Sequence, residues 1–484
     1  MGRGRRPGAG VWGLLCLGGL ALTACSPYWP MSDDLEAAIE AEAGPLTPRI
    51  DDDDAVREVA EETIRGEVAL PEPIALPEGA GLDKYVELAL LRNPRIRARI
   101  RDIEALGMRV PQVTSLSDPS LNFGVPVSNN LQTAAGEVSG SVGLSQSIPF
   151  PTKLAAMGRV AEQVVKVAFE NLRSARLRVA AEVKQAYATY SLSFTSVGVT
   201  RELEDLLRSA RDTAEARYRA GTTTQQDVLR AEVELYDLAN RRITYEQEQR
   251  TALARLNILM DRAVASALPE PPVVAPEKTA FTLVELLVKG TEENPELAAL
   301  REQVAGNLES AALARQQYLP DLSIGGLWTI VSSAGLSPIA TGADVVGLNL
   351  GVSLPISFHR IRAGILQRNA ETLSTAMRWR SRRNELLFQM QDLLVRIDTS
   401  YRRAVLLQDG ILPRARQSVR VSQADYESGR LEFNSLIENW RRFLDLRLDY
   451  HVALSRLESD AAELERLVGG TLPQGDEPEK RDDR

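Results

Sequence analysis

The chain is short of the side chains that catalytic and metal sites most often use. Its 484 residues include two cysteines, Cys16 and Cys25, and two histidines, His359 and His451. Two cysteines cannot form a disulfide framework, and a zinc site of four Cys and His ligands is nearly impossible because Cys16 lies in an apolar leader. The seven methionines form no paired clusters. We therefore expect no metal site and no cofactor.

Enzyme motifs and positive charge are also missing. The sequence has no nucleophile elbow, no His-Glu-x-x-His and no phosphate-binding loop. Paired acids such as Asp102/Glu104 and Glu302/Glu309 lie among helical surface charges, where solvation explains them. A formal net charge of -9 argues against binding to nucleic acid, whose phosphates require a basic surface. We expect neither an enzyme nor a nucleic-acid-binding protein.

The N-terminus indicates export and a lipid anchor. Three arginines precede the apolar stretch Val11–Ala24, which is too short to span a bilayer and typical of a signal-peptide core. This stretch ends in small residues directly before Cys25, in a pattern that resembles the bacterial lipobox, where the thiol is acylated. The alternative is an ordinary secretory signal that contains a cysteine. We predict a signal peptide over residues 1–24 and lipidation of Cys25. The residue after the cysteine is Ser26 and not Asp, which by resemblance to lipoproteins favours sorting of the protein to the outer membrane.

Both ends of the mature chain have compositions that disfavour a packed core. Residues 25–80 contain the run Asp51–Asp54, further acidic residues and several prolines, which predicts a lipid-anchored tether. Residues 470–484 are highly charged, and we expect a disordered tail there.

Between these ends the sequence is duplicated. The matched pairs are Asn93-Pro94 with Asn294-Pro295, Ile148-Pro149 with Leu354-Pro355, and Tyr218-x-x-Gly221 with Tyr426-x-x-Gly429. Their offsets are 201, 206 and 208 residues, in constant order, as a duplication with small insertions would produce. We predict a first repeat over 81–268, a linker over 269–280 and a second repeat over 281–469.

Each repeat contains two windows without charged side chains. The windows are 119–136 and 138–152 in the first repeat, and 322–343 and 345–358 in the second. The clearest alternation runs from Val346 to Ile356, where every second residue is apolar, and a period of two predicts a strand. A half-buried strand of a soluble sandwich would alternate in the same way. The absence of charge on both faces and the lipobox favour transmembrane strands, which need about 9–11 residues.

Four such strands cannot close a barrel, and an open edge in lipid leaves backbone groups unsatisfied. Closure therefore requires several chains, and three copies would supply twelve strands, an even number typical of such barrels.

The remaining sequence predicts unusually long helices. Residues 153–219 contain no proline, and apolar or small residues recur in steps of four, four and three, which is the period of a nearly straight helix. At about 1.5 Å per residue this helix would extend roughly 100 Å. Further helices are expected over 225–260, 361–407, 412–426 and 436–467. A soluble coiled coil would explain the helices alone, so a soluble periplasmic coiled-coil scaffold is the alternative function.

Taken in order, these features resemble the TolC family of outer-membrane efflux proteins over about residues 81–469. The segment Ser145–Leu154 is similar to the subgroup associated with heavy-metal pumps. The resemblance implies an α+β membrane protein: a homotrimer with a 12-stranded β-barrel in the outer membrane, continued by a long α-helical coiled-coil barrel across the periplasm. It also implies a passive exit duct whose partners are a periplasmic adaptor (membrane fusion) protein and an inner-membrane pump, of the RND type. The sequence does not specify the cargo.

The same resemblance locates a gate at the two Tyr-x-x-Gly motifs. Gly221 and Gly429 would form the tip turns, Asp227 matches the family's acidic latch residue, and Tyr426 matches its hydrogen-bonding partner in the other repeat. The alternative for Asp227 is an acid in the first turn of a helix, stabilised by the helix dipole.

Two family positions differ in this chain. The family places two Asp residues after the second glycine, around the aperture, and these positions hold Ser435 and Glu438 here. A latch arginine of the family falls on Leu431. Glu438 is therefore the remaining candidate for the aperture, with an exposed helix face as its alternative explanation, and the closed state must be held differently.

Overall fold

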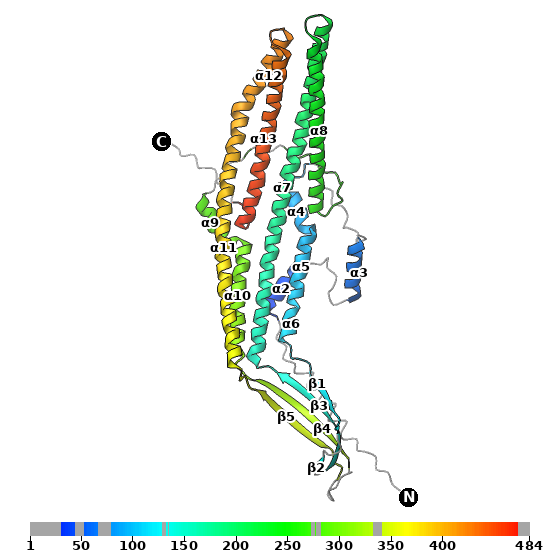
Figure 1. Cartoon of the computed structure of the whole chain (residues 1–484), viewed down its shortest axis with the longest axis vertical. Coiled ribbons are helices and arrows are strands. Elements are labelled where there is room, and N and C mark those ends of the chain that lie inside the picture. The colour runs from blue at the N-terminus through cyan, green and yellow to red at the C-terminus, as the bar shows by residue number, and fades with distance from the viewer. Residues whose placement is uncertain are drawn as a thin grey trace, which may run out of the picture. The chain divides into compact units, whose positions relative to one another are not determined.

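The computed structural model describes residues 31–43, 53–65, 79–127, 132–133, 135–272, 276, 282–332 and 341–472 (Figure 1). These residues form two compact units. Unit 1 takes in the described parts of 31–43, 101–169 and 299–378, and unit 2 takes in those of 53–100, 170–298 and 379–472. The signal peptide and Cys25 lie outside the described residues.

Unit 1 contains an antiparallel sheet in the order β1-β3-β4-β5. Its strands are β1 (Ser120–Gly124), β3 (Gly136–Ile148), β4 (Asp321–Ser332) and β5 (Val345–Ser353), and the two-residue β2 (Gln132–Thr133) pairs with β3. Each predicted window therefore contains most of one principal strand, although β3 begins at Gly136 and β4 at Asp321. In the described residues four principal strands and the short β2 form the sheet. The pairing of β3 with β4 joins the two halves of the sequence.

The strand register sorts the side chains onto two faces. Phe123 pairs with Val142, Val142 with Trp328, and Trp328 with Val346. Directly paired residues point to the same face of an antiparallel sheet, so this row is apolar across all four strands. The next row, one residue along, contains Asn122, Gly143, Leu327 and Gly347. The sheet consequently has one apolar face and one face dominated by small and polar residues.

The helices of unit 1 include one that the sequence prediction missed. They are α2 (Asp33–Ala43), α6 (Arg109–Thr114) and parts of α5 (Pro94–Gly107), α7 (Pro151–Arg219), α10 (Pro295–Gln316) and α11 (Phe358–Val405). Residues 25–80 were expected to be a tether without a core, and this is wrong for α2. Met31, Leu35 and Ile39 are spaced four residues apart and buried, and Ser32 N donates a hydrogen bond to Glu162 Oε1 at 3.1 Å.

Unit 2 is helical. Its other helices are α3 (Asp53–Arg65), α4 (Leu82–Arg92), α8 (Gln225–Leu259), α9 (Leu283–Glu293), α12 (Leu412–Glu427) and α13 (Phe433–Val468). The predicted long helices agree with α7, α8, α11, α12 and α13 to within three residues at each end. A π turn, Leu406–Ile411, which the sequence did not predict, joins α11 to α12.

Two large apolar clusters and a small one lie in the described part of unit 2. The first joins α7, α8, α12 and α13 near their turns and includes Leu207, Tyr426, Phe433 and Trp440. The second joins α9, α10, α11 and the end of α13. Among the described residues, no helix is both long enough and apolar enough to cross a membrane.

Candidate functional site

The turn between α7 and α8 and the turn between α12 and α13 have the same backbone structure. Gly221 has φ +70° and Gly429 has φ +77°, the left-handed conformation that glycine adopts most easily. The residue after each glycine donates its N–H to the carbonyl five residues back: Thr222 N to Arg217 O at 2.9 Å and Arg430 N to Asp425 O at 2.8 Å. This pattern ends a helix and satisfies its last carbonyls. We call these two turns, with the helix ends beside them, the tips.

Tyr426 belongs to the apolar cluster that joins α7, α8, α12 and α13, which we call the tip cluster. Its side chain is buried, and its ring centroid lies 5.3 Å from that of Phe433. Among the described residues its hydroxyl has no hydrogen-bond partner. Burial raises the pKa of Tyr426, the nearby charge of Asp227 raises it further, and Arg217 opposes the shift. The Asp227 carboxylate instead accepts a hydrogen bond from the Thr223 hydroxyl at the start of α8. Within one chain, therefore, Asp227 and Tyr426 are neighbours without a mutual hydrogen bond.

Arg217 is the tip residue that the sequence reasoning missed. Its Nη1 donates to the carbonyl oxygen of Tyr426, and its Cζ lies 5.0 Å from the centroid of the Tyr426 ring, in cation–π geometry. A Cβ at Gly429 would lie 3.2 Å from Arg217 Nη2. One arginine from α7 therefore ties the α7–α8 tip to the α12–α13 tip. It directly precedes Tyr218-x-x-Gly221, but its partner is 209 residues away, so the motif alone could not identify it.

The two positions that differ from the family have distinct environments. Leu431 packs against the apolar tip cluster, so an apolar contact stands at the position for which the resemblance predicts a latch arginine. Its neighbour Arg430 forms an ion pair with Asp425 at 2.7 Å. Glu438 is exposed on α13, and Ser435 is half-buried.

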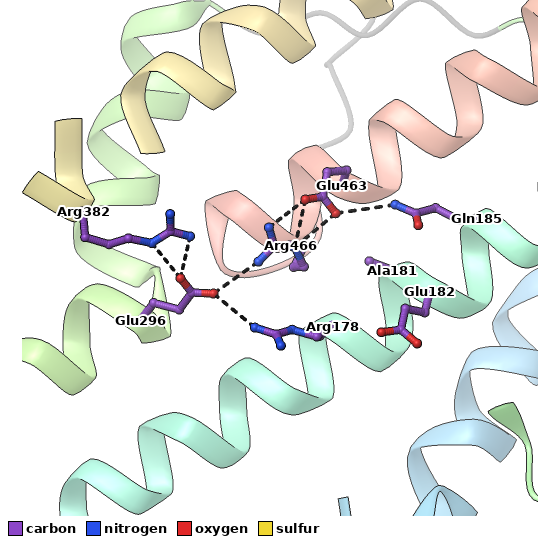
Figure 2. Close-up of a pocket in the computed structure, with 8 residues that line it drawn as sticks. All are labelled: Arg178, Ala181, Glu182, Gln185, Glu296, Arg382, Glu463 and Arg466. Atoms are coloured by element: carbon purple, nitrogen blue, oxygen red, sulfur yellow. Dashed lines mark hydrogen bonds and ion pairs between the residues drawn. The ribbon is translucent and has the colours of Figure 1, made fainter. Parts of the chain in front are cut away.

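A second polar constellation in unit 2 is centred on the carboxylate of Glu296. Figure 2 shows three arginines from three helices converging on it. Arg382 Nη2 lies 2.6 Å from Glu296 Oε2, while Arg466 Nη1 and Arg178 Nη2 lie 3.3 and 3.7 Å from Oε1. Arg466 also pairs with Glu463 at 2.7 Å. Arg382 also pairs with Glu385 at 3.0 Å, so three arginines meet three carboxylates, and the arrangement joins α7, α10, α11 and α13.

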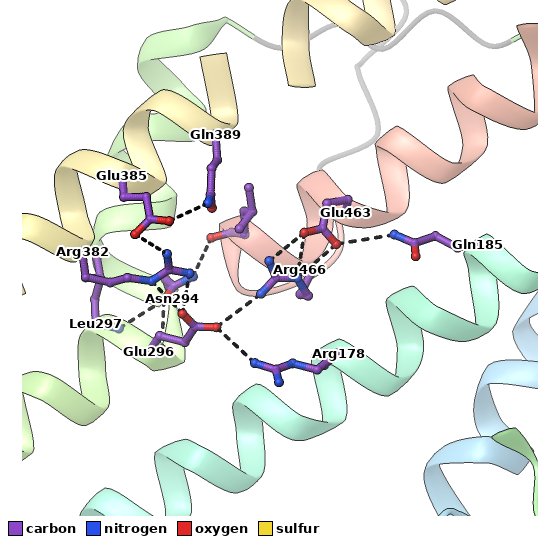
Figure 3. Close-up of polar contacts among 11 residues, drawn as sticks. Arg178, Gln185, Asn294, Glu296, Leu297, Arg382, Glu385, Gln389, Glu463 and Arg466 are labelled. Carbon is purple, nitrogen blue, oxygen red and sulfur yellow. Dashed lines mark hydrogen bonds and ion pairs between the residues drawn. The ribbon is translucent and has the colours of Figure 1, made fainter. Parts of the chain in front are cut away.

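Asn294 is buried beside this constellation (Figure 3), and together with the buried Asn93 it explains the duplicated Asn-Pro motif. Asn294 Nδ2 donates to the carbonyl of Leu467 at 2.8 Å, and its Oδ1 accepts from Glu296 N at 2.9 Å. In the first half, Asn93 Nδ2 donates to Leu259 O at 2.9 Å and its Oδ1 accepts from Arg95 N at 3.0 Å. Each asparagine thus caps the helix that begins at the proline and holds the end of a returning helix.

In unit 1 a buried lysine fixes the junction between strands and helices. Lys153, at the start of α7, donates to Asp321 Oδ1 at 2.7 Å and to the carbonyl of Leu319 at 2.8 Å. Phe150 N donates to the same Asp321 oxygen at 3.1 Å. The end of β3 is therefore bonded to the start of β4.

The two histidines lie in different environments. Burial, with a smaller contribution from Arg447, lowers the pKa of His451 to about 4, so its imidazole is neutral at pH 7. His359 is exposed at the start of α11. Within the described ranges, no group of three or more His, Cys, Asp or Glu side chains could hold a metal ion.

Comparisons with known proteins found a matching family model, related sequences and solved structures with the same fold. The family model described as outer membrane efflux protein matches residues 85–260 and 286–470. The chain is 25% identical over 387 residues to outer membrane protein OprJ of Pseudomonas aeruginosa, covering 76% of this chain and 78% of that protein. It is 22% identical over 410 residues to the cobalt-zinc-cadmium resistance protein CzcC of Cupriavidus metallidurans, covering 82% and 92%. The solved structure of outer membrane protein VceC from Vibrio cholerae shares the fold, with a TM-score of 0.65, 16% identity and coverage of 81% and 96%.

Proposed function

The chain belongs to the outer membrane efflux protein family, and we propose that three copies of it form a passive exit duct. In this arrangement the three sheets close into one 12-stranded β-barrel in the outer membrane, and the long helices continue it as a tube in the periplasm. The duct catalyses no reaction. A soluble periplasmic scaffold, the alternative from the sequence, leaves the apolar sheet face without a role.

The observation that carries the proposal is the sorting of side chains by the strand register. Val346, Leu348 and Leu350 of β5 are 80, 73 and 75% exposed in the single chain, although they belong to the apolar face. The edge strands β1 and β5 also have a free side each. Lipid would cover the apolar face, and neighbouring copies would pair the two edges, which satisfies the backbone groups that lipid cannot.

The helices support the same assembly. α8 exposes apolar side chains at heptad-like spacing, and α11 exposes another apolar series. The α8 series is Leu229, Val233, Tyr236 and Ile243, and the α11 series is Leu366, Leu373, Met377, Phe388 and Val395. Both stripes face solvent in one chain. Packing of each stripe against the next copy would close the tube and bury them.

Native mass spectrometry of protein extracted in detergent tests the assembly. We expect a complex of three chains, each starting at Cys25 and carrying a diacylglyceryl group on that residue, because the lipobox-like sequence precedes it. A stable single chain that retains its β-structure would contradict the trimer and the pore. An unmodified Cys25 would contradict the anchor while leaving the barrel intact.

The two faces of β5 should respond differently to charge. Leu348→Arg places a cation on the apolar face and should cost about 2–4 kcal/mol near the middle of the bilayer, so we expect loss of membrane insertion. Asn349→Arg, one residue along and on the opposite face, should be tolerated. Heat-resistant trimer in outer-membrane fractions measures both. Equal loss in the two variants would contradict the assignment of the lipid face.

We place the gate at the tips. Arg217 holds Tyr426 and the turn of the other tip, which is a contact of about 1–2 kcal/mol. Loss of this contact should raise the fraction of open channels by about 5–30-fold. An adaptor that binds the open form better could supply the same free energy. The exposed Glu438 would form a ring of three carboxylates near the aperture.

Single-channel recording in planar bilayers tests the gate. Arg217→Ala should raise the open fraction, whereas Arg219→Ala, whose partner Glu215 is on the same helix, should leave it unchanged. Among the described residues the Tyr426 hydroxyl has no hydrogen-bond partner. A higher open fraction in Tyr426→Phe would therefore show that this hydroxyl bonds to a neighbouring copy, such as to its Asp227, and an unchanged open fraction would show that it does not. Glu438→Gln should reduce cation preference only. An unchanged open fraction in Arg217→Ala would remove Arg217 from the gate.

The partners we propose are a periplasmic adaptor protein and an inner-membrane pump of the RND type. The likeness to CzcC, whose name specifies cobalt, zinc and cadmium resistance, favours a metal-exporting pump. The duct itself would contact this cargo only in passing.

A further inference from the structure

The long helix that leads to the second tip is interrupted by a π turn. Leu412 N donates its hydrogen bond to Leu407 O, five residues back, whereas an α-helix uses the carbonyl four residues back. α7, which leads to the first tip, is a continuous α-helix over its 69 residues. π turns in α-helices are rare and occur frequently at functional sites.

The local sequence explains the wider turn. Pro413 has no N–H, and its ring clashes with the carbonyl four residues back in a regular helix. Gly410 is a poor helix former, and Arg414 Nη1 donates a hydrogen bond to its carbonyl oxygen at 2.6 Å. The second half also has more residues to accommodate: 74 separate Pro355 from Gly429, whereas 72 separate Pro149 from Gly221. The π turn absorbs one of them.

The apolar packing along this helix is also interrupted at the π turn. On the tip side, Leu412 and Val419 belong to the tip cluster. On the other side, Ala404 packs in a separate small cluster with Ala453 and Leu454 of α13. Within the π turn, Leu406, Gln408 and Asp409 are exposed and Leu407 is buried. The π turn therefore separates two apolar clusters, and Gln408 Oε1 within it accepts a hydrogen bond from the Tyr450 hydroxyl of α13 at 3.2 Å.

We propose that the π turn is the hinge at which α12 shifts relative to α11 when the tip opens. This inference rests on the proposed gate at the tips. In this movement, backbone amides at the π turn exchange a hydrogen bond to the carbonyl five residues back for one to the carbonyl four residues back. α12 then moves by one residue, which is a rotation of about 100° and a rise of about 1.5 Å, without breaking the helix. Since α12 carries Tyr426, the shift withdraws it from Arg217. α13 has no such interruption and follows by gentle bending.

The test measures tip separation across the trimer. A spin label on Ser428→Cys, which is exposed in the second tip, reports distances between copies by double electron–electron resonance. In the Arg217→Ala background we expect a long-distance component from open tips. Deletion of Gly410 together with Pro413→Ala restores a regular helix and should remove that component. Gly198→Ala in α7, where a Cβ would meet open space, is the matched control and should retain it.

Each outcome decides the proposal. Persistence of the long component in the deletion variant would overturn the hinge but leave the gate. Absence of the component from Arg217→Ala itself would overturn the gate, and the hinge with it. If the deletion variant fails to form a trimer by native mass spectrometry, Gly410→Ala replaces it. Its Cβ would lie 3.6 Å from Leu406 Cδ1, an ordinary contact, so it should fold and weaken the long component, and no change there would also overturn the hinge.

Discussion

Asp321→Ala should lower the free energy of unfolding by about 3–5 kcal/mol, because it leaves the ammonium group of Lys153 buried without a counter-charge. The Lys153 side chain is only 4% exposed. After the substitution its one remaining partner is the carbonyl of Leu319, and the amide of Phe150 loses its acceptor as well. The damage falls where β3, β4 and α7 meet, so sheet and helix should loosen together.

Chemical unfolding in detergent, followed by circular dichroism at fixed protein concentration, measures this loss. Adding Lys153→Met to Asp321→Ala should recover part of it, because the buried charge is then absent. Glu309→Gln removes the more exposed ion pair with Arg159, which has a 2.9 Å separation, and should cost less than about 1 kcal/mol. If Asp321→Ala costs no more than Glu309→Gln, water reaches Lys153 and the junction is not held by this pair.

The parts of the fold that local patterns determine were predictable. Strands appeared as a period of two and helices as a period near 3.6, because one side of each element meets apolar surroundings. α2 was missed because the acidic composition of residues 25–80 concealed Met31, Leu35 and Ile39, which need only one helix face. The π turn was missed because its cause is a clash of Pro413 with the preceding turn, which periodicity does not register. The pairing of β3 with β4 depends on residues almost 200 positions apart.

In the candidate site, too, local patterns revealed some residues, whereas those that depend on distant contacts were missed. The turns at Gly221 and Gly429 were predictable because a left-handed turn leaves a glycine in a recognisable motif, and their place at the gate stays a prediction. Arg217 was not found, since its role depends on a carbonyl of Tyr426 that carries no side-chain signature. Likewise Lys153 and Asp321 are separated by 168 residues, and neither residue type is unusual at the start of a helix or strand. The Asn-Pro motif was recognised as a repeat marker, but its contacts with Leu259 and Leu467 required the structure.

Loss of those contacts should cause the second large loss of stability that we expect. Asn294→Ala should destabilise unit 2 by about 2–4 kcal/mol, because it leaves several buried backbone groups without partners. Asn294 is fully buried. Its Oδ1 accepts from Glu296 N and Leu297 N at 2.9 and 3.1 Å, and its Nδ2 supplies the donor for Leu467 O.

The close fit around Asn294 makes the prediction specific. A Cβ at Gly469 would lie 2.5 Å from Glu293 O, so the end of α13 is pressed against the backbone just before Asn294. Asn93→Ala should have a similar cost, since Asn93 makes the corresponding contacts with Leu259 and Arg95. Asn307→Ala, which removes a partly buried bond to Thr375, is the matched control and should cost about 1 kcal/mol. Unfolding free energies measured under identical conditions rank the three variants. Equal costs for Asn294→Ala and Asn307→Ala would show that the break between α9 and α10 is held by apolar packing, and that the asparagine is dispensable.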